Sequence, residues 1–303
     1  MKPRGAFLIL VLLACVLDIA PARAFDFVLY SQNMLRFGQG SRLVEQCQAI
    51  TDEAATADII VIQEWMTSGY PCGAVPAGFK FEFFGPLGAN TYKEYYGFLY
   101  RSDKVFAHPV VQYQNQCRQG GNGVCTKPFT GDYAVYVRPP TALLFRVTRT
   151  TGTSFDIWIG DMHSVFGKTV GPREDEAKAA ATFFQSLRTD GTPPVGGWPT
   201  IIAGDWNLPI TNSSGTTVNA GFTWLAGQNA AGLPTNIATS LTRDGDDVSS
   251  PYDHIIYNVV TGSPAHGITL TNVVRKPILD TEWPTWRQNV SDHLGVQAEV
   301  TVQ

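Results

Sequence analysis

Acidic, amide and imidazole side chains recur in this sequence at the ends of short apolar stretches. In chain order they are Asn33, Glu64, His163, Asp205 with Asn207, Asp253, and Asp292 with His293. One Asp or Asn after a strand is usually a turn residue, and one isolated His is usually structural. Several such groups in equivalent positions instead predict a cluster of acid–base groups and oxygen ligands at one edge of a sheet.

These residue types point to hydrolysis with a divalent cation. Carboxylate and amide oxygens are hard ligands that suit Mg²⁺, Mn²⁺ or Ca²⁺ better than zinc. An imidazole can accept or release a proton near neutral pH, and a carboxylate beside it fixes which ring nitrogen carries that proton. The set therefore favours a metal-assisted hydrolase.

The elements that must position these groups are mainly short strands. Apolar, β-branched and aromatic runs predict strands at residues 25–30, 58–63, 79–84, 95–100, 141–147, 155–162, 200–203, 252–257 and 293–302. The apolar periodicity predicts helices at 41–55, capped by Ser41, and at 172–187, with a third at 217–228. No segment resembles a linker or a repeat. The simplest interpretation is one α/β domain rich in strands.

The first 24 residues have the pattern of a secretory signal. Lys2 and Arg4 precede an apolar run at 6–17, and Ala22-Arg23-Ala24 forms an A-x-A cleavage site. We therefore expect a signal peptide at 1–24, a mature domain at 25–303, and a secreted protein in the periplasm or outside the cell. The segment that ends in Cys15 resembles a lipoprotein processing site, so processing at Cys15 stays open as an alternative.

The charge balance excludes some classes of protein. Loss of Lys2, Arg4, Arg23 and Asp18 with the signal would leave 19 basic and 25 acidic side chains, a net charge of −6. This excludes a polybasic nucleic-acid binder, but not an enzyme that acts briefly on a polyanion. No apolar run approaches the roughly 20 residues of a spanning helix, which argues against an integral membrane protein.

The cysteines agree with export. Without Cys15, four remain, an even number that allows three disulfide pairings. Cys117 and Cys125 flank a Gly-rich stretch that a disulfide would close, which leaves Cys47 to pair with Cys72. A zinc site is the rival interpretation, but neither pair has CxxC spacing and no His lies close in sequence.

The motifs and their order resemble the endonuclease/exonuclease/phosphatase superfamily. The residues that carry the resemblance are Gln63-Glu64, His163-Ser164, Gly204-Asp205-Trp206-Asn207 and Ser291-Asp292-His293. Segment 86–101, which contains Tyr92 and Glu94, closely resembles the part of secreted deoxyribonuclease I enzymes that holds a catalytic Glu. Segment 252–255 resembles their second acidic motif, and the Cys117–Cys125 loop lies where that family has a small disulfide loop. The similarity extends over nearly all of 25–303.

The resemblance implies an α+β fold, a four-layer αββα sandwich of two packed mixed β-sheets flanked by helices. It also implies hydrolysis of phosphodiester bonds by two imidazoles, one acting as base on water and one as acid on the leaving oxygen. In the roles carried over, Glu94 orients His163 and Asp253 orients His293.

The resemblance also implies roles in binding. The metal would be Mg²⁺, with Mn²⁺ as a substitute and a structural Ca²⁺ as an addition, and its ligands would be Glu64, Asn33, Asp205 and Asp292. Asp205 and Asn207 would bind metal or phosphate and stabilise the transition-state charge. Tyr92 corresponds to the minor-groove tyrosine of the family, and Asn33 and Asn207 would contact the substrate.

The sequence departs from the family in its expected contacts to duplex DNA. Met66 stands where the family has an Arg two residues past the metal Glu, and an Arg expected near 131–133 is missing. Trp283 and Trp286 precede the last motif, in a place where related sphingomyelinases carry an aromatic hairpin. These two rings could be packed inward, stack on bases or enter a lipid interface.

Three interpretations of function therefore compete. A secreted, monomeric, metal-dependent deoxyribonuclease with DNA as substrate is favoured by Tyr92-Lys93-Glu94. A sphingomyelinase-like phospholipid phosphodiesterase with transient lipid contact is favoured by Trp283 and Trp286. The third is a catalytically silent binding module or toxin subunit of the same fold, and the intact set of imidazoles and carboxylates argues against it.

Overall fold

The computed structural model describes residues 25–88, 93–109, 118–119, 123–129, 135–188, 199–210, 230–232, 237–258 and 267–303. The expected signal peptide, the expected helix at 217–228, Tyr92 and Cys117 lie outside the described residues. Within the described part, no helix combines the length and apolar character needed to cross a membrane.

The first of two large sheets has the strand order β15-β16-β1-β2-β4-β3 and is mixed, because β1 and β2 run parallel while the other neighbours are antiparallel. Its strands are β1 (Phe27–Phe37), β2 (Ile59–Trp65), β3 (Phe79–Leu87), β4 (Glu94–Arg101), β15 (Ile268–Arg275) and β16 (Val296–Val302). Strand β2 is almost continuously apolar and buried, because both of its faces are covered. Strand β16 alternates buried and half-buried residues, as its place nearer the sheet edge predicts.

The second large sheet is also mixed, with the order β11-β14-β10-β9-β8-β7-β6 and β5 paired to β8. Strands β9 and β10 are parallel and the other pairs are antiparallel. The strands are β5 (Val105–Ala107), β6 (Arg118–Gln119), β7 (Cys125–Pro128), β8 (Thr141–Thr148), β9 (Ser154–His163), β10 (Thr200–Asp205), β11 (Ala230–Gly232) and β14 (Asp253–Asn258). A separate hairpin pairs β12 (Ser240–Leu241) with β13 (Val248–Ser250).

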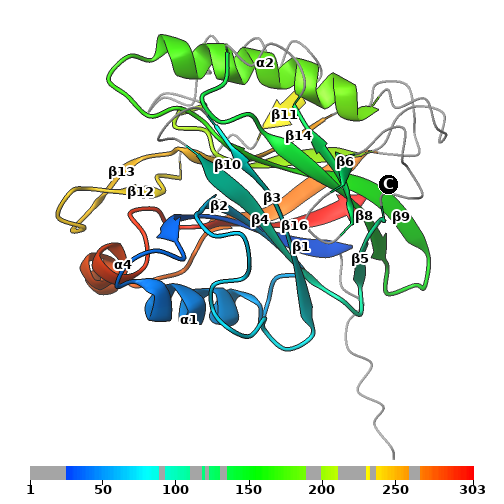
Figure 1. Ribbon diagram of the computed structural model, residues 1–303, viewed down its shortest axis with the longest axis horizontal. Coiled ribbons are helices and arrows are strands. Elements are labelled where there is room, and N and C mark those ends of the chain that lie inside the picture. The colour runs from blue at the N-terminus through cyan, green and yellow to red at the C-terminus, as the bar shows by residue number, and fades with distance from the viewer. Residues whose placement is uncertain are drawn as a thin grey trace, which may run out of the picture.

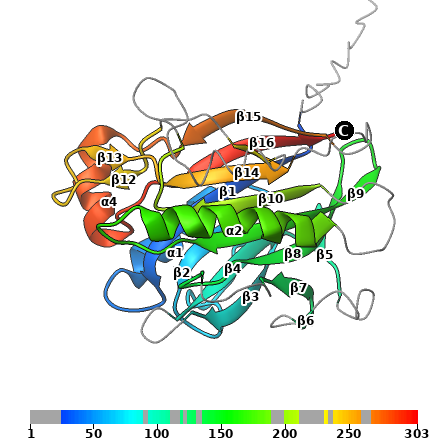
Figure 2. The same cartoon turned by 90° about the horizontal axis from the view of Figure 1, so that it is seen from above.

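Helices cover the outer faces of both sheets (Figure 1). Helix α1 (Leu43–Glu53) packs on the first sheet, and α2 (Gly171–Arg188) lies over the second. The turn η3 (Asp280–Glu282) leads into α4 (Trp283–Asn289), which lies with β12 and β13 at one end of the molecule in both views (Figures 1 and 2). One apolar core fills the space between the sheets, and two more lie beneath α1 and α2. The predicted four-layer αββα sandwich is therefore confirmed.

The predicted strands are all present, and the predicted helices 41–55 and 172–187 correspond to α1 and α2. The predicted helix cap is wrong, because α1 begins after Arg42 and no side-chain hydrogen bond caps it. The last strand begins at Val296, which leaves His293 in an isolated bridge with Ser240. The sequence pattern does not predict β15 or α4, since only one residue of β15 is fully buried and α4 is short.

A disulfide joins Cys47 of α1 to Cys72 in the loop before β3, with a Cα–Cα distance of 5.5 Å. This predicted pair is confirmed. Cys125 is also disulfide-bonded, and its predicted partner Cys117 lies outside the described residues.

Candidate active site

A cleft of about 480 Å³ is lined in part by α4 and the β12–β13 hairpin. These elements lie together at one end of the sandwich (Figures 1 and 2). The residues that line the cleft come from both large sheets, the hairpin, α4 and the connecting loops: Asn33, Glu64, Arg138, His163, Phe166, Asp205, Asn207, Ser240, Leu241, Arg243, Ser249, Ser250, Tyr252, Arg287, Asp292 and His293. The sequence-predicted site residues Asn33, Glu64, His163, Asp205, Asn207, Asp292 and His293 are among them. Glu94 and Asp253 lie behind the two imidazoles.

Strand register brings three of these groups together in the second sheet. Asp205 ends β10 and is paired with His163, the last residue of the parallel strand β9. On its other side Asp205 is paired with Asp253, the first residue of the antiparallel strand β14. The ends of parallel strands and the start of an antiparallel one meet at the same edge, so the topology alone makes these residues neighbours.

Gly204 permits the close approach of β10 to β9 at this point. Its φ of +148° is rarely adopted by other residues, and a Cβ atom there would lie 1.9 Å from the carbonyl oxygen of Met162. The small residue before Asp205 is therefore a packing requirement of the site.

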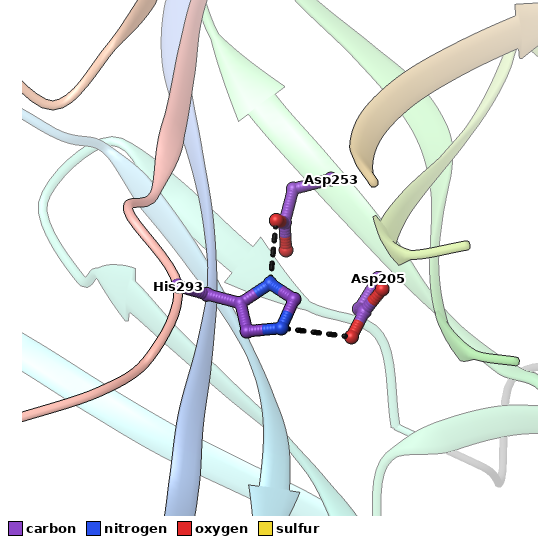
Figure 3. Close-up of side chains that lie close together, drawn as sticks. All are labelled: Asp205, Asp253 and His293. Carbon is purple, nitrogen blue, oxygen red and sulfur yellow. Dashed lines mark hydrogen bonds and ion pairs between the residues drawn. The ribbon is translucent and has the colours of Figure 1, made fainter. Parts of the chain in front are cut away.

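Two buried imidazole–carboxylate pairs form the centre of the site. His163 Nδ1 lies 2.9 and 3.1 Å from the two carboxylate oxygens of Glu94. His293 Nδ1 lies 2.7 Å from Asp253 Oδ2. The Nε2 atoms of the two imidazoles lie 3.6 and 3.5 Å from the same oxygen, Oδ2 of Asp205. Figure 3 shows His293 between its two aspartates.

The carboxylates raise the pKa of both imidazoles. For His163, burial and the charge of Arg138 lower the pKa, but Glu94 and Asp205 outweigh them and the net shift is upward. For His293, burial lowers the pKa, and Asp253 and Asp205 raise it well above its usual value. Each carboxylate on Nδ1 favours the tautomer that carries a proton there, which leaves Nε2 directed at Asp205 and the cleft.

Glu64 and Asn33 approach Asp205 from the first sheet. Asn33 Nδ2 donates to Glu64 Oε1 at 3.3 Å and to Asp205 Oδ2 at 3.1 Å, while its Oδ1 accepts a bond from the backbone N–H of Leu35 at 3.0 Å. The other oxygen of Glu64 accepts a bond from the N–H of Arg36 at 3.0 Å. In this orientation Asn33 holds two carboxylates side by side.

The backbone is strained at two of the site residues. Glu64 has φ +58° and Asn207 has φ +48°, in the left-handed region that side-chain-bearing residues rarely adopt. Such strain costs of order 1–3 kcal/mol per residue and clusters at functional sites, where surrounding contacts hold it. Here Asp205 Oδ1 accepts a bond from the Asn207 N–H at 2.8 Å, and Asn207 Nδ2 donates to Ser164 O at 3.0 Å.

Several carboxylates of the cleft could serve as metal ligands. Asp205, Asp253 and His293 have ligand atoms within 4.8 Å of one another and could hold a metal ion. Glu64 and Asp292 add two partly exposed carboxylates to the lining. Asp292 Oδ2 lies 3.7 Å from Arg287 Nη1. Oxygen-rich sets of this kind suit hard divalent cations.

Arg138, which is not among the sequence-predicted site residues, also lines the cleft. Arg138 is 7% exposed and donates to the carbonyl oxygens of His163 at 3.1 Å and Ser164 at 2.7 Å. Its Nε also lies 3.7 Å from Glu94 Oε2. The expected position at 131–133 lies outside the described residues, and no motif in the sequence marks Arg138 as a site residue.

The two tryptophans before the last motif are packed into the protein. Trp283 is buried and packs against Leu241 and Leu294. Trp286 is half-buried, and its indole N–H donates to the carbonyl oxygen of His293 at 2.8 Å. These contacts match the packed interpretation of this segment, and no lipid contact is shown.

No profile of a known protein family matches the chain. A protein named "Deoxyribonuclease" from Thioalkalivibrio sp. (strain K90mix) is 27% identical over 97% of this chain and 75% of its own length. The crystal structure of an endonuclease/exonuclease/phosphatase from Bacteroides vulgatus is 14% identical, covers 91% of this chain and 99% of its own, and has a TM-score of 0.55. Sphingomyelinase C from Streptomyces griseocarneus is 12% identical over 90% of this chain and 98% of its own, with a TM-score of 0.50.

These similarities confirm the resemblance to the endonuclease/exonuclease/phosphatase superfamily at the level of the fold. The fold is shared by proteins named as an endonuclease/exonuclease/phosphatase and as a sphingomyelinase, so the substrate must be argued from the site.

Proposed function

We propose that this chain is a divalent-metal-dependent endonuclease that hydrolyses phosphodiester bonds of DNA by general acid–base catalysis. The observation that carries the proposal is the convergence of two buried imidazole–carboxylate pairs on one oxygen of Asp205. Phosphodiester hydrolysis needs one proton removed from water and one delivered to the leaving oxygen, and two imidazoles on either side of a phosphate can do both. The 27% identical relative named "Deoxyribonuclease" supports DNA as the substrate.

In this mechanism His163 and His293 are the proton-transfer groups. Glu94 and Asp253 fix the Nδ1–H tautomers, so each Nε2 faces the phosphate. One imidazole removes the proton of the attacking water, and the other protonates the departing sugar oxygen. Arg138 and Asn207 also line the cleft, and the positive charge of Arg138 would favour the negative charge that develops on the phosphate oxygens.

The metal ligands in this proposal are Glu64, Asp205 and Asp292, with Asn33 supporting the first two. Glu64 and Asp205 share the Asn33 amide, so two carboxylates converge where a cation would neutralise them. Bound there, Mg²⁺ or Mn²⁺ would neutralise phosphate charge in the transition state. Asp253 is fully buried against His293 Nδ1, so we assign it to orienting the imidazole instead of binding metal.

Export is part of the proposal. The signal pattern at 1–24 and the disulfide between Cys47 and Cys72 support a secreted protein whose mature domain is 25–303. The described part of the mature domain forms one sandwich with its own core, and in this proposal the enzyme acts as a monomer. Tyr92 is proposed to contact the minor groove beside the scissile phosphate, so Tyr92→Ala would impair cleavage of duplex DNA.

The decisive experiment uses the mature protein on plasmid DNA and on sphingomyelin vesicles, with Mg²⁺ and with EDTA. We expect plasmid nicking that requires Mg²⁺, and a fall by orders of magnitude in Glu64→Gln, which keeps the shape and loses the charge. Raised Mg²⁺ or Mn²⁺ should rescue Glu64→Gln in part. Normal activity of Glu64→Gln at low Mg²⁺ would contradict the metal site, and turnover of sphingomyelin alone would contradict the nuclease.

A further inference from the structure

An exposed aromatic ring stands at the edge of the catalytic cleft. Phe166 lines the cleft three residues after His163, yet 74% of the residue is accessible to solvent. The described residues include other exposed apolar side chains, such as Phe106 and Val170, but none of these lines the cleft. Because the ring lines the same cleft as His163 and His293, it is placed to contact a ligand bound there.

The loop that carries Phe166 is held in place on the N-terminal side of the ring. The Ser164 N–H donates to Asp205 O at 2.8 Å, and Ser164 O accepts bonds from Arg138 and Asn207. The next N–H, of Val165, donates to Glu176 Oε2 at 2.7 Å. The backbone is therefore fixed up to the residue before Phe166, so the ring is presented from a defined point.

Glu176 makes this anchor firm. It is fully buried in α2, and its other oxygen, Oε1, accepts a bond from the Val137 N–H at 2.9 Å. One carboxylate thus ties the loop of Phe166 to the loop of Arg138. The positive charge of Arg138 and the backbone that leads to Phe166 are therefore fixed relative to each other.

The rest of the cleft is polar. Apart from Phe166, its described lining has one aliphatic side chain, Leu241, which is 5% exposed, and the half-buried ring of Tyr252. An acyl chain would find little apolar wall here. A nucleobase, by contrast, has a flat face for one ring and polar edges for the surrounding side chains.

We propose that Phe166 stacks on an unpaired nucleobase next to the scissile phosphate, so that the cleft favours single-stranded DNA. This inference rests on the proposed nuclease function and extends it to the form of the substrate. In a duplex, neighbouring bases cover both faces of each base, and a base must be extruded before a side chain can stack on it. In a single strand those faces are free.

The test uses an oligothymidylate in which every linkage except one is a methylphosphonate, so that one bond is cleavable. Phe166→Ala should lower kcat/KM on this single strand by roughly 5- to 150-fold, the range for loss of one base stack. Phe166→Trp should retain activity. Cleavage of duplex plasmid should change little. The matched control is Phe106→Ala, which removes an exposed aromatic ring of β5 that does not line the cleft.

An abasic residue on either side of the cleavable bond locates the stacked base. At one of the two positions, the abasic residue should reduce wild-type kcat/KM as much as Phe166→Ala does on the intact strand. On that abasic substrate, Phe166→Ala should cause no further loss of kcat/KM. Losses that multiply on both sides, or normal single-strand cleavage by Phe166→Ala, would overturn the stacking role while the nuclease stands. Phe166-dependent binding to sphingomyelin vesicles with intact DNA cleavage would assign the ring to a membrane instead. No cleavage of any DNA by the wild type would overturn both proposals.

Discussion

His163 ends a regular strand, whereas His293 lies in the segment between α4 and β16. The place of His163 follows from sheet register, since β9 and β10 pair up to His163 and Asp205. His293 has no such ladder. Its carbonyl oxygen accepts bonds from Gln32 Nε2 at 3.0 Å and Trp286 Nε1 at 2.8 Å, so distant side chains fix its backbone.

The two imidazoles also differ in their charged surroundings. Arg138 lies beside the Glu94–His163 pair and opposes the rise of the His163 pKa. Near His293 the charges that act are those of Asp253, Asp205 and Asp292, and its pKa rises further. Similar geometry at Asp205 thus comes with different charged neighbours, a guanidinium beside His163 and a third carboxylate near His293.

Loss of either imidazole is the largest effect expected from this comparison. His163→Ala and His293→Ala should each lower kcat on plasmid DNA by about 10²- to 10⁴-fold, the usual contribution of a general acid or base. If the two imidazoles act on one phosphate, the double variant should be little worse than the worse single variant. A double variant equal to the product of two small losses would mean that they act independently.

Changes to the carboxylates that orient the imidazoles should lower kcat less than loss of either imidazole does. Glu94→Gln and Asp253→Asn retain an oxygen acceptor for Nδ1 but lose the charge that stabilises the imidazolium. We expect falls in kcat of about 10- to 100-fold, as for other groups that orient a catalytic or ligand imidazole. Circular dichroism should show intact folds. A carboxylate variant as inactive as its His variant would make that carboxylate a direct participant.

Groups at strand ends could be predicted from the sequence, whereas the contacts that fix His293 and the exposure of Phe166 could not. The cluster of acid–base groups at one sheet edge could be predicted, because Glu64, His163 and Asp205 each follow an apolar run that forms a strand. The contacts of Gln32 and Trp286 with the His293 carbonyl oxygen could not be predicted. Gln32 lies 261 residues away in sequence, and Trp286, although only seven residues away, bonds to a backbone atom whose position depends on the fold. Phe166 gives no sequence signal, because only the tertiary structure shows that it is exposed beside a catalytic group.

Loss of the indole N–H of Trp286 should lower kcat by a small factor. Trp286→Phe keeps a ring in the packing and removes the N–H that donates to His293 O. Loss of one hydrogen bond should lower kcat about two- to tenfold and leave KM unchanged. The bond that Arg138 Nε donates to the carbonyl oxygen of His163 should stay intact. Trp283→Phe is the control, because within the described residues its Nε1 has no hydrogen-bond partner. Equal losses of kcat in both variants would point to general packing.

Asp161, a buried acid near His163, should make the stability of the fold depend on pH. Asp161 lies two residues before His163 in β9 and is fully buried. Its Oδ1 accepts a bond from Gln63 Nε2 at 2.6 Å, and among the described residues Oδ2 has no hydrogen-bond partner. Burial raises the pKa of Asp161 well above its usual range, and the charge of Glu94 adds to the rise against the hydrogen bond from Gln63.

The pH dependence of unfolding follows from this raised pKa. The folded chain keeps the Asp161 proton at pH values where the unfolded chain has released it, so this residue destabilises the fold increasingly as pH rises above about 4. Asp161→Asn cannot ionise. Its Tm should equal that of the wild type near pH 3 and exceed it by a few degrees at pH 8.

Asp156→Asn is the control, because hydrogen bonds and charges of His108 and Arg146 outweigh burial and lower the pKa of Asp156. That variant should instead lose Tm relative to the wild type as pH rises through the acid range. A constant Tm difference for Asp161→Asn from pH 3 to pH 8 would show that Asp161 is not a buried, protonated acid.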